Sequence, residues 1–438
     1  GVTTSIVRVW YAGDETDQKG VAVMAGEKML MGLDIGSSRT RCVIGSVSRD
    51  GQLMVDSICE HPSEGVRAGS IVNIEQTLKT IQTVINEAEL QAGAEMNEVI
   101  IGIGGENIVG IASTGVVGIN SKDQEIKRED IFRSLEVARA FELPQDREIL
   151  HTLVQDFQID GQMGIKDPID MLGHRLESRV LIVTAASSMC QNERKCIQRS
   201  GLTVQRLVLQ SLADSEVVLS SEEKEMGTIL INIGSGITNM IAYSNGAPVY
   251  TGGVNLGGEA VTNDIAYILN KTRAAAEQIK CESGHSYVPS VSSDDMILIP
   301  QVGGLPSIKM PKKELSKVIE PRMAEIFSRL QSDLEKAQIQ GSFGGGVVLV
   351  GGGALLSGVT ELASEIFRLP ARLGFPEAIG GLDRSYISPQ YTTVLGLLKS
   401  EARKVRETGT SSKSRKERVH RKEGGAASKL RGFFRTLF

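Results

Sequence analysis

The stretch MGLDIGSSRTRCVIGS, residues 31–46, decides the fold, because it places one carboxylate, Asp34, at the end of an apolar run and directly before a glycine turn. GLDIG reads as a short buried strand, SS as a turn and RTRCVIGSV as a second strand. An Asp-Gly pair at 50–51 then predicts a hairpin that leads into a third strand. Because glycine lets the backbone approach an anion closely, the unit can hold a phosphate group.

The same pattern recurs further along the chain, in residues 228–254. TILINIG predicts a strand, SG a turn, ITNMIAYS a second strand, and an Asn-Gly pair at 245–246 a hairpin. Two similar units predict two lobes, each opening with a β-meander, whose glycine turns face each other across a cleft. The hydroxyls expected to line up on phosphate oxygens there are those of Ser37, Ser38, Ser235 and Thr238.

A third glycine turn follows in VVLVGGGALLSGVTELASEIF, residues 347–367, which predicts a buried strand, three glycines and an amphipathic helix. Glycines at a strand-to-helix turn commonly admit a nucleotide, although a tight loop needs the same residues. No G-x-x-x-x-G-K-[ST] motif is present, which excludes the P-loop class. A carboxylate beside bound phosphates holds Mg²⁺ through its water shell, and this is the role that we expect for Asp34.

The composition indicates a globular protein, since the 438 residues are 41% hydrophobic and 23% charged. Five cysteines without a C-x-x-C pair indicate neither a disulfide framework nor a zinc site, so a reducing cytoplasm fits best. We find no apolar run long enough for a membrane span and no export signal in residues 1–30, which we expect to form an unstructured extension.

Between the strands lie segments with helical spacing, so that strands alternate with helices as in α/β lobes. The helices are predicted at residues 74–90, 128–143, 193–201, 257–269 and 312–338.

The C-terminal part of the chain is basic: residues 399–438 contain 13 basic and 4 acidic residues, a net charge of +9, which leaves −14 for the rest. SKLRGFFRTLF, at the very end, predicts an amphipathic helix that lies on an anionic membrane behind a flexible tether. Its apolar residues follow i, i+3, i+4, i+7, i+8 spacing, and cations flank them. The membrane-binding residues are predicted to be Leu430, Phe433, Phe434, Leu437, Phe438, Lys429, Arg431 and Arg435.

These motifs resemble the FtsA family of bacterial cell-division proteins along the chain from Met31, most specifically in residues 150–184. The resemblance implies an α/β, actin-like (ribonuclease H-like) two-lobed ATPase fold with an FtsA-type extra subdomain, and ATP with Mg²⁺ in the cleft. It also implies head-to-tail polymerisation, binding of the tubulin-like protein FtsZ, and recruitment of later division proteins through the extra subdomain. The expected location is the cytoplasmic face of the membrane at the division site, and no nucleic-acid partner is expected.

The resemblance also divides the chain into segments. Residues 31–105, 186–220 and 380–398 form the first lobe, 106–186 the extra subdomain, 221–260 and 335–379 the second lobe, 261–334 a small subdomain over the nucleotide, 399–425 a flexible linker, and 426–438 the membrane helix.

Nucleotide contacts follow from the same resemblance. They are Gly36, Ser37, Ser38 and Arg39 in the first phosphate turn, Gly234, Ser235, Gly236 and Thr238 in the second, and Gly351, Gly352, Gly353, Glu277 and Lys280 near the nucleoside. Glu277 and Lys280 share one helical face, where an ordinary surface ion pair is the alternative.

Asp34 and Gln210 are the candidate catalytic residues, Gln210 because it falls where actins carry a water-orienting glutamine, although it could simply end a strand. Asn232 and Asn239 depart from the family, whose members usually carry aspartate there. An amide cannot offset a cation's charge, so we expect a slow ATPase at most, acting mainly as a scaffold. On the sequence alone, Asn232→Asp should raise the hydrolysis rate.

Two alternatives remain open. A small-molecule kinase of the same superfamily would need a substrate-facing aspartate as general base, for which no convincing candidate stands outside the phosphate turns. A pilus-assembly relative that binds a partner's peptide would not need an amphipathic terminus.

Overall fold

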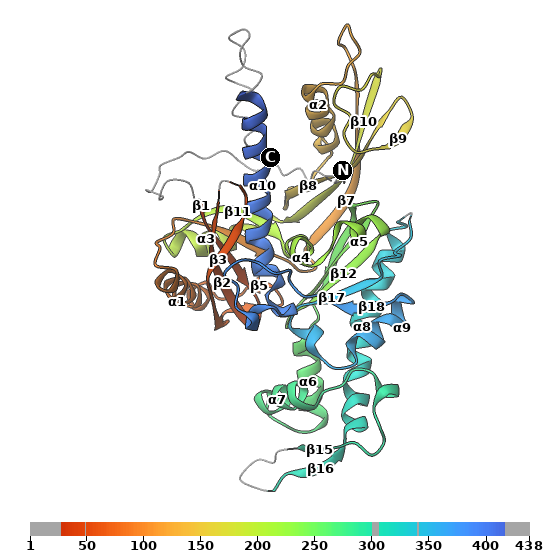
Figure 1. Cartoon of the computed structure of the whole chain (residues 1–438). Coiled ribbons are helices and arrows are strands. Elements are labelled where there is room, and N and C mark those ends of the chain that lie inside the picture. The colour runs from red at the N-terminus through yellow and green to blue at the C-terminus, as the bar shows by residue number, and fades with distance from the viewer. Residues whose placement is uncertain (1–27, 49, 300–305, 340, 417–438) are drawn as a thin grey trace.

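The structure, a computed structural model, describes residues 28–48, 50–299, 306–339 and 341–416. Two lobes lie side by side, a further sheet stands above them, and a small subdomain extends below (Figure 1). Each lobe is built on a five-stranded sheet, and the strands follow the same order in both. The two-lobe prediction from the repeated sequence pattern is therefore confirmed.

In the first lobe, an antiparallel meander is extended by two strands that run parallel to its first strand. Met31 and Leu33 pack into the core on one face of this sheet, whereas Leu30 packs into the core on the other. Because both faces are covered, the first strand reads as a continuous apolar run. The strands are β1 (Lys28–Ile35), β2 (Arg39–Val47), β3 (Leu53–Pro62), β6 (Glu98–Ile103) and β11 (Thr203–Leu209).

The second lobe repeats this arrangement, with a meander and two parallel strands. The strands are β12 (Thr228–Ile233), β13 (Thr238–Ser244), β14 (Ala247–Val254), β17 (Val347–Val350) and β18 (Ala371–Leu373). In both lobes the first strand lies in the sheet interior and delivers its carboxyl end to the space between the lobes.

The sheet above the lobes is wholly antiparallel and has its own hydrophobic core. Its strands are β7 (Ile108–Gly118), β10 (Arg175–Ala186), β8 (Arg147–Ile159) and β9 (Gln162–Ile165), in that order. Helix α2 (Arg128–Arg139) packs closely on it, since a Cβ added to Gly115 would lie 1.8 Å from the Ser134 carbonyl oxygen.

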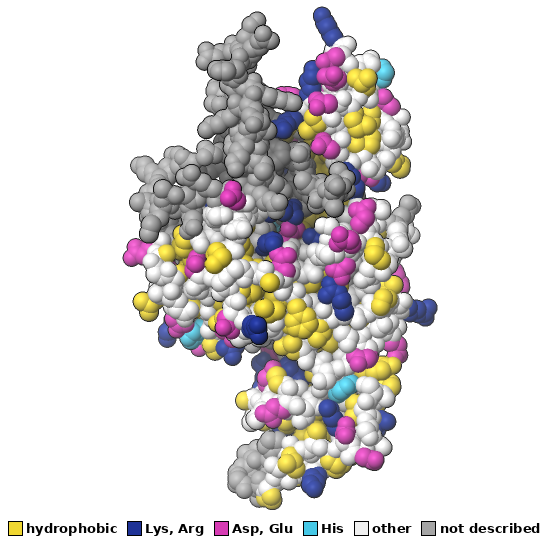
Figure 2. All heavy atoms as spheres, in the orientation of Figure 1, with side chains coloured by type: hydrophobic (Ala, Val, Ile, Leu, Met, Phe, Trp, Pro, Cys, Tyr) yellow, Lys and Arg dark blue, Asp and Glu magenta, His cyan; other side chains and the backbone are white. Residues whose placement is uncertain are grey.

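The small subdomain contains a hairpin at the lower tip of the molecule, where apolar side chains are exposed (Figure 2). Its elements are α6 (Gly258–Ile268), α7 (Arg273–Ser283), β15 (Met296–Ile299), β16 (Ile308–Pro311) and α8 (Lys312–Lys336). The remaining helices and strands, apart from short 3₁₀ turns, are α1 (Ile74–Ala92), α3 (Ser187–Arg199), α4 (Gln210–Val218), α5 (Ser221–Met226), α9 (Val359–Phe367), α10 (Thr392–Lys416), β4 (Val66–Arg67) and β5 (Ser70–Ile71).

All five predicted helices are present, with shifted ends. Helix α3 begins at Ser187, six residues before its predicted start, because Met189 and Cys190 continue its buried face. Helix α2 ends at Arg139, four residues early. Strand β1 begins at Lys28, so that residues 28–30 belong to the sheet and not to the predicted extension.

The prediction of a flexible linker at residues 399–425 is wrong for its first part, because α10 continues to Lys416. Leu398 and Ala402 are buried against the first lobe, and Glu401 forms an ion pair with Arg206. A Cβ added to Gly396 would lie 1.9 Å from a carbonyl oxygen of α4, so that the two helices approach as closely as backbones can. The charged composition after residue 398 gave no sign that the helix, whose mostly apolar first part at 392–398 is buried, continues.

Within the described ranges, no helix is both long enough and apolar enough to cross a bilayer. The predicted membrane helix at residues 426–438 lies outside the described residues, as do the rest of the predicted linker after Lys416 and residues 1–27.

Candidate functional site: a cleft between the lobes

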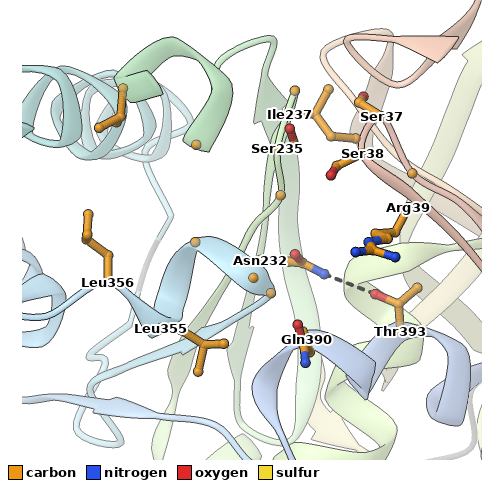
Figure 3. Close-up of a pocket in the computed structure, with 18 of the residues that line it drawn as sticks. Ser37, Ser38, Arg39, Asn232, Ser235, Ile237, Leu355, Leu356, Gln390 and Thr393 are labelled. Carbon is orange, nitrogen blue, oxygen red and sulfur yellow. Dashed lines mark hydrogen bonds between the residues drawn. The ribbon is translucent and has the colours of Figure 1, made fainter. Parts of the chain in front are cut away.

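The two lobes enclose a cavity of about 670 Å³, into which all three glycine turns open. Figure 3 shows Ser37 and Ser38 from one lobe close to Ser235 and Ile237 from the other. Asp34, Gln210 and twelve of the thirteen predicted nucleotide contacts line this cavity. Segments far apart in the sequence therefore meet at one place.

The first two glycine turns have the same local geometry. In the first, the Gly36 amide donates to the Arg39 carbonyl over 3.1 Å, and in the second the Gly234 amide donates to the Ile237 carbonyl over 2.9 Å. A Cβ added to Gly236 would lie 2.6 Å from the Ser37 hydroxyl oxygen, which brings the two turns into contact. Paired turns of this kind present backbone N–H groups and hydroxyls to an anion from both sides.

The third turn follows β17, and its three glycines differ in what surrounds them. Gly351 has a φ of 86°, in the left-handed region, and a Cβ added to Gly353 would lie 2.4 Å from the Ile233 side chain. A Cβ added to Gly352 would meet nothing within 4 Å, although Gly352 lines the cavity. This position therefore borders free space that a ligand can occupy.

A chain of buried side chains fixes Asp34 at the base of the cleft. The Gln210 amide donates to Asp34 Oδ1 over 2.7 Å, and the Asn239 amide donates to Gln210 Oε1 over 2.9 Å. Burial raises the pKa of Asp34, and the Arg41 charge and the Gln210 hydrogen bond oppose that shift. Gln210 thus links the carboxylate of the first lobe to the second lobe's strand β13.

A second buried network surrounds Asn232 at the end of β12. The Asn232 amide donates to Asp214 Oδ2 over 2.7 Å and to Thr393 Oγ1 over 3.0 Å, the latter bond being drawn in Figure 3. Thr392 and Thr393 both donate to Asp214 Oδ1. Burial raises the pKa of Asp214 to about 7 despite these three donors. A carboxylate, that of Asp214, therefore lies beside Asn232, although it is contributed by α4 and not by β12.

Glu277 and Lys280 lie on α7 at the cavity wall and form an ion pair over 2.8 Å. Burial alone would raise the pKa of Glu277, but hydrogen bonds from Lys280 and Thr262 outweigh it, so that the pKa is lowered. Lys280 also donates to the Gly258 carbonyl over 3.0 Å. The pair joins α7 to α6 as well as facing the cavity.

Thr238 is the one predicted contact that does not line the cavity. Its side chain is fully buried, and its hydroxyl donates to the Leu256 carbonyl over 2.8 Å. The prediction that this hydroxyl faces a phosphate is therefore wrong: the residue is already part of β13, where alternate side chains point away from the cleft.

Sequence reasoning missed Glu193 and Asp214. Asp214 follows Gln210 by four residues, which places both on one face of α4, and this spacing was a signal. Glu193 is a single acidic residue on the otherwise apolar face of α3, among Met189, Cys190, Cys196 and Ile197. An isolated charge in such a row was the available signal there.

The donor set suits a divalent cation bound together with phosphates. Asp34 and Glu193 offer carboxylate oxygens at the cleft wall, and Glu193 Oε2 is buried without a hydrogen-bond partner. Mg²⁺ takes one or two carboxylates and completes its shell with water and phosphate oxygens. Among the described residues, no group of three His, Cys, Asp or Glu side chains could hold a metal by itself.

Comparison with known proteins gives consistent results along the chain. Residues 229–396 match the family described as "Cell division protein FtsA", and residues 105–184 match the "SHS2 domain inserted in FTSA". The chain is 40% identical to Cell division protein FtsA of Borreliella burgdorferi over 93% of its own length and 98% of the relative's. It is 38% identical to that of Pseudomonas aeruginosa, over 86% and 90% of the two chains.

Solved structures share the fold at low sequence identity. A type IV pilus biogenesis complex of PilM and PilN contains a chain with a TM-score of 0.60 at 17% identity, covering 85% of this chain and 98% of that one. MreB 5 of Spiroplasma citri bound to AMPPNP has a TM-score of 0.51 at 13% identity, covering 87% and 99%. These likenesses confirm the predicted actin-like α/β fold.

Proposed function

Because the chain belongs to the FtsA family of cell division proteins, we propose that it binds ATP with Mg²⁺ between its lobes and acts as a membrane-attached scaffold. The observation that carries the nucleotide part is the meeting of three glycine turns, contributed by two lobes, around one cavity that also contains Asp34. MreB 5, which shares the fold, holds an adenine nucleotide analogue in its crystal structure.

Each turn has its own task in this proposal. Backbone N–H groups of the first two turns, with the hydroxyls of Ser37, Ser38 and Ser235, bind the phosphates. Gly351–Gly353, Glu277 and Lys280 surround the nucleoside. Mg²⁺, when bound, offsets phosphate charge.

Hydrolysis is proposed to be slow. Gln210 orients the attacking water, but its amide is already held between Asp34 and Asn239. Asn232 and Asn239 add no negative charge at the metal. A turnover number near 10 s⁻¹, about the median for enzymes, would contradict this part of the proposal.

The scaffold part of the proposal rests on family membership. We infer that subunits polymerise head to tail on the cytoplasmic face of the membrane, tether FtsZ at the division site and recruit later division proteins through the sheet of β7–β10, where the SHS2 match lies. The small-molecule kinase and pilus-assembly alternatives are disfavoured, because the relatives that cover most of the chain are cell division proteins.

Liposome co-sedimentation of the full chain tests the scaffold part. Phe434→Glu places a charge in the middle of the apolar arc of the C-terminal segment, so it should release the protein from anionic liposomes while ATP affinity is unchanged. Because tethered tails act together, binding of the parent protein should rise steeply with protein concentration. Equal sedimentation of variant and parent would show that the anchor lies elsewhere.

A further inference from the structure

We propose that Glu193, with Asp34, holds the divalent cation in this cleft and supplies negative charge that the asparagines of the second lobe do not. The inference rests on the proposed nucleotide binding and extends it to a residue that neither the glycine turns nor the resemblance indicated. Its basis is the position of the Glu193 side chain.

Glu193 occupies a core position of α3. It is only 5% exposed, and the small exposed part lies at the cavity wall. Burying a carboxylate among apolar side chains is costly unless the group is paired. Nevertheless Oε2 of Glu193 has no hydrogen-bond partner. A buried acceptor without a donor calls for a partner such as an ion, and Glu193 lines a cavity from which one can reach it.

Asp34 lies within electrostatic reach of Glu193. Burial is the main cause that raises the pKa of Glu193, to about 8, and the negative charge of Asp34 is the second. Arg194 and Arg41 oppose the rise in the pKa of Glu193 and of Asp34, respectively, but each is shared, since Arg194 binds Glu148 with two hydrogen bonds and Arg41 pairs with Glu60 over 3.0 Å. Two acidic groups therefore line the same cavity and interact, with only shared cations to offset their charge.

A divalent cation would relieve this imbalance. Mg²⁺ commonly binds through one or two carboxylates, often by way of its own water molecules, together with substrate phosphates. Asp34 lies near the carboxyl end of β1, the strand that leads into the first phosphate turn, so a cation beside it also reaches a bound phosphate. Asn232 and Asn239 can then remain amides, because the charge on the protein side comes from α3.

The test measures metal affinity rather than turnover. The full-length protein is saturated with a non-hydrolysable ATP analogue and titrated with Mn²⁺, and free Mn²⁺ is followed by electron paramagnetic resonance. Glu193→Gln should weaken Mn²⁺ binding about tenfold or more, as the loss of a residue around a metal does. Glu216→Gln serves as the control, because the Glu216 side chain is only 5% exposed but pairs with Lys224 and Arg403 and does not line the cavity, so its Mn²⁺ affinity should equal that of the parent.

In a second experiment, the protein is titrated with the ATP analogue in the presence of EDTA. This distinguishes a failure of the proposed nucleotide binding from a failure of the inference about Glu193. Glu193→Gln should bind the metal-free analogue at least as tightly as the parent, since glutamine keeps the shape of the side chain and adds no negative charge at the cavity wall. If the parent binds no analogue, the proposed function fails. If both bind it and their Mn²⁺ affinities are equal, the inference about Glu193 is overturned.

Crystals of the parent protein keep the inference testable if Glu193→Gln does not fold. With Mn²⁺ and the analogue present, the anomalous difference map should place the ion within direct or one-water reach of both Asp34 and Glu193. An ion that reaches Asp34 alone would overturn the inference.

Discussion

At the scale of single residues, the pairing of Asn232 with Asp214 changes how the departure from the family pattern is understood. The Asn232 amide donates to Asp214 Oδ2, whereas Thr392 and Thr393 donate to the other oxygen, and this carboxyl is fully buried. An aspartate at 232 would both remove that donor and place a second carboxylate beside the first. The amide at this position is therefore required by its neighbour on α4.

We predict that Asn232→Asp alone destabilises the protein, contrary to the simple expectation of a faster enzyme. The lost donor and the like charges should lower the free energy of unfolding by about 1–3 kcal/mol at pH 7, as measured by urea denaturation. The exchange Asp214→Asn with Asn232→Asp restores the pair in reverse and should recover most of that loss. A single variant as stable as the parent, or an exchange no better than the single variant, would refute the pairing argument.

Glu193 should make stability depend on pH. Its pKa in the folded protein is raised from 4.5 to about 8, so the folded state binds more protons than the unfolded state between these values. The free energy of unfolding of the parent therefore loses this contribution as pH rises from about 4.5 to 8, whereas Glu193→Gln does not. Without divalent cations, the difference between variant and parent should grow across this range to a few kcal/mol, at about 1.36 kcal/mol per pKa unit. A difference that is constant with pH would contradict the burial of an ionisable group.

At the scale of elements, α10 ties the C-terminal part of the chain to the cleft. Thr392 and Thr393 at the start of the helix donate hydrogen bonds to Asp214 on α4. Gly396 lets the helix approach α4 closely, and Glu401 further along pairs with Arg206. The helix thus positions one wall of the site and also carries the chain toward its terminus.

We predict that removing Glu401 lowers the free energy of unfolding more than removing Lys28, which is one of its two ion-pair partners. Glu401→Ala removes the carboxylate that pairs with the mostly buried Arg206 over 2.7 Å and should cost about 3–5 kcal/mol of unfolding free energy. Lys28→Ala removes a half-exposed partner 3.5 Å from the same carboxylate and should cost about 0–1 kcal/mol. Urea denaturation measures the loss of unfolding free energy in both variants. Equal losses would contradict the prediction that the more buried ion pair contributes more.

The sequence predicted those elements whose signal is local. Glycine turns at Gly36, Gly234 and Gly351, and the meanders around them, follow from turn chemistry and apolar runs, which a few neighbouring residues determine. The continuation of α10 beyond residue 398 was missed because that part of the helix is charged, whereas the buried stretch that anchors it, residues 392–398, precedes it. Asp214 and Glu193 were missed because their roles depend on contacts with strands far away in the sequence.

At the scale of the whole molecule, the cleft is lined by segments of both lobes and of the small subdomain. The first turn belongs to β1 and β2, the second to β12 and β13, the third follows β17, and α7 closes one side. The same strand order in both lobes explains why two turns of equal geometry meet face to face. Binding of ATP with Mg²⁺ in this cleft is therefore the central claim to test.

Calorimetric titration of the full-length protein with ATP, with and without Mg²⁺, tests that claim most directly. Gly352→Asp is the matched variant: a Cβ at this position meets no protein atom, so the fold should be kept while a carboxylate enters the ligand space. We predict that one ATP binds per chain and that Mg²⁺ makes the binding tighter. The affinity of the variant for ATP should be at least about tenfold lower, which corresponds to about 1.4 kcal/mol of charge repulsion. The absence of saturable binding, or equal affinities for the folded variant and the parent, would contradict the claim.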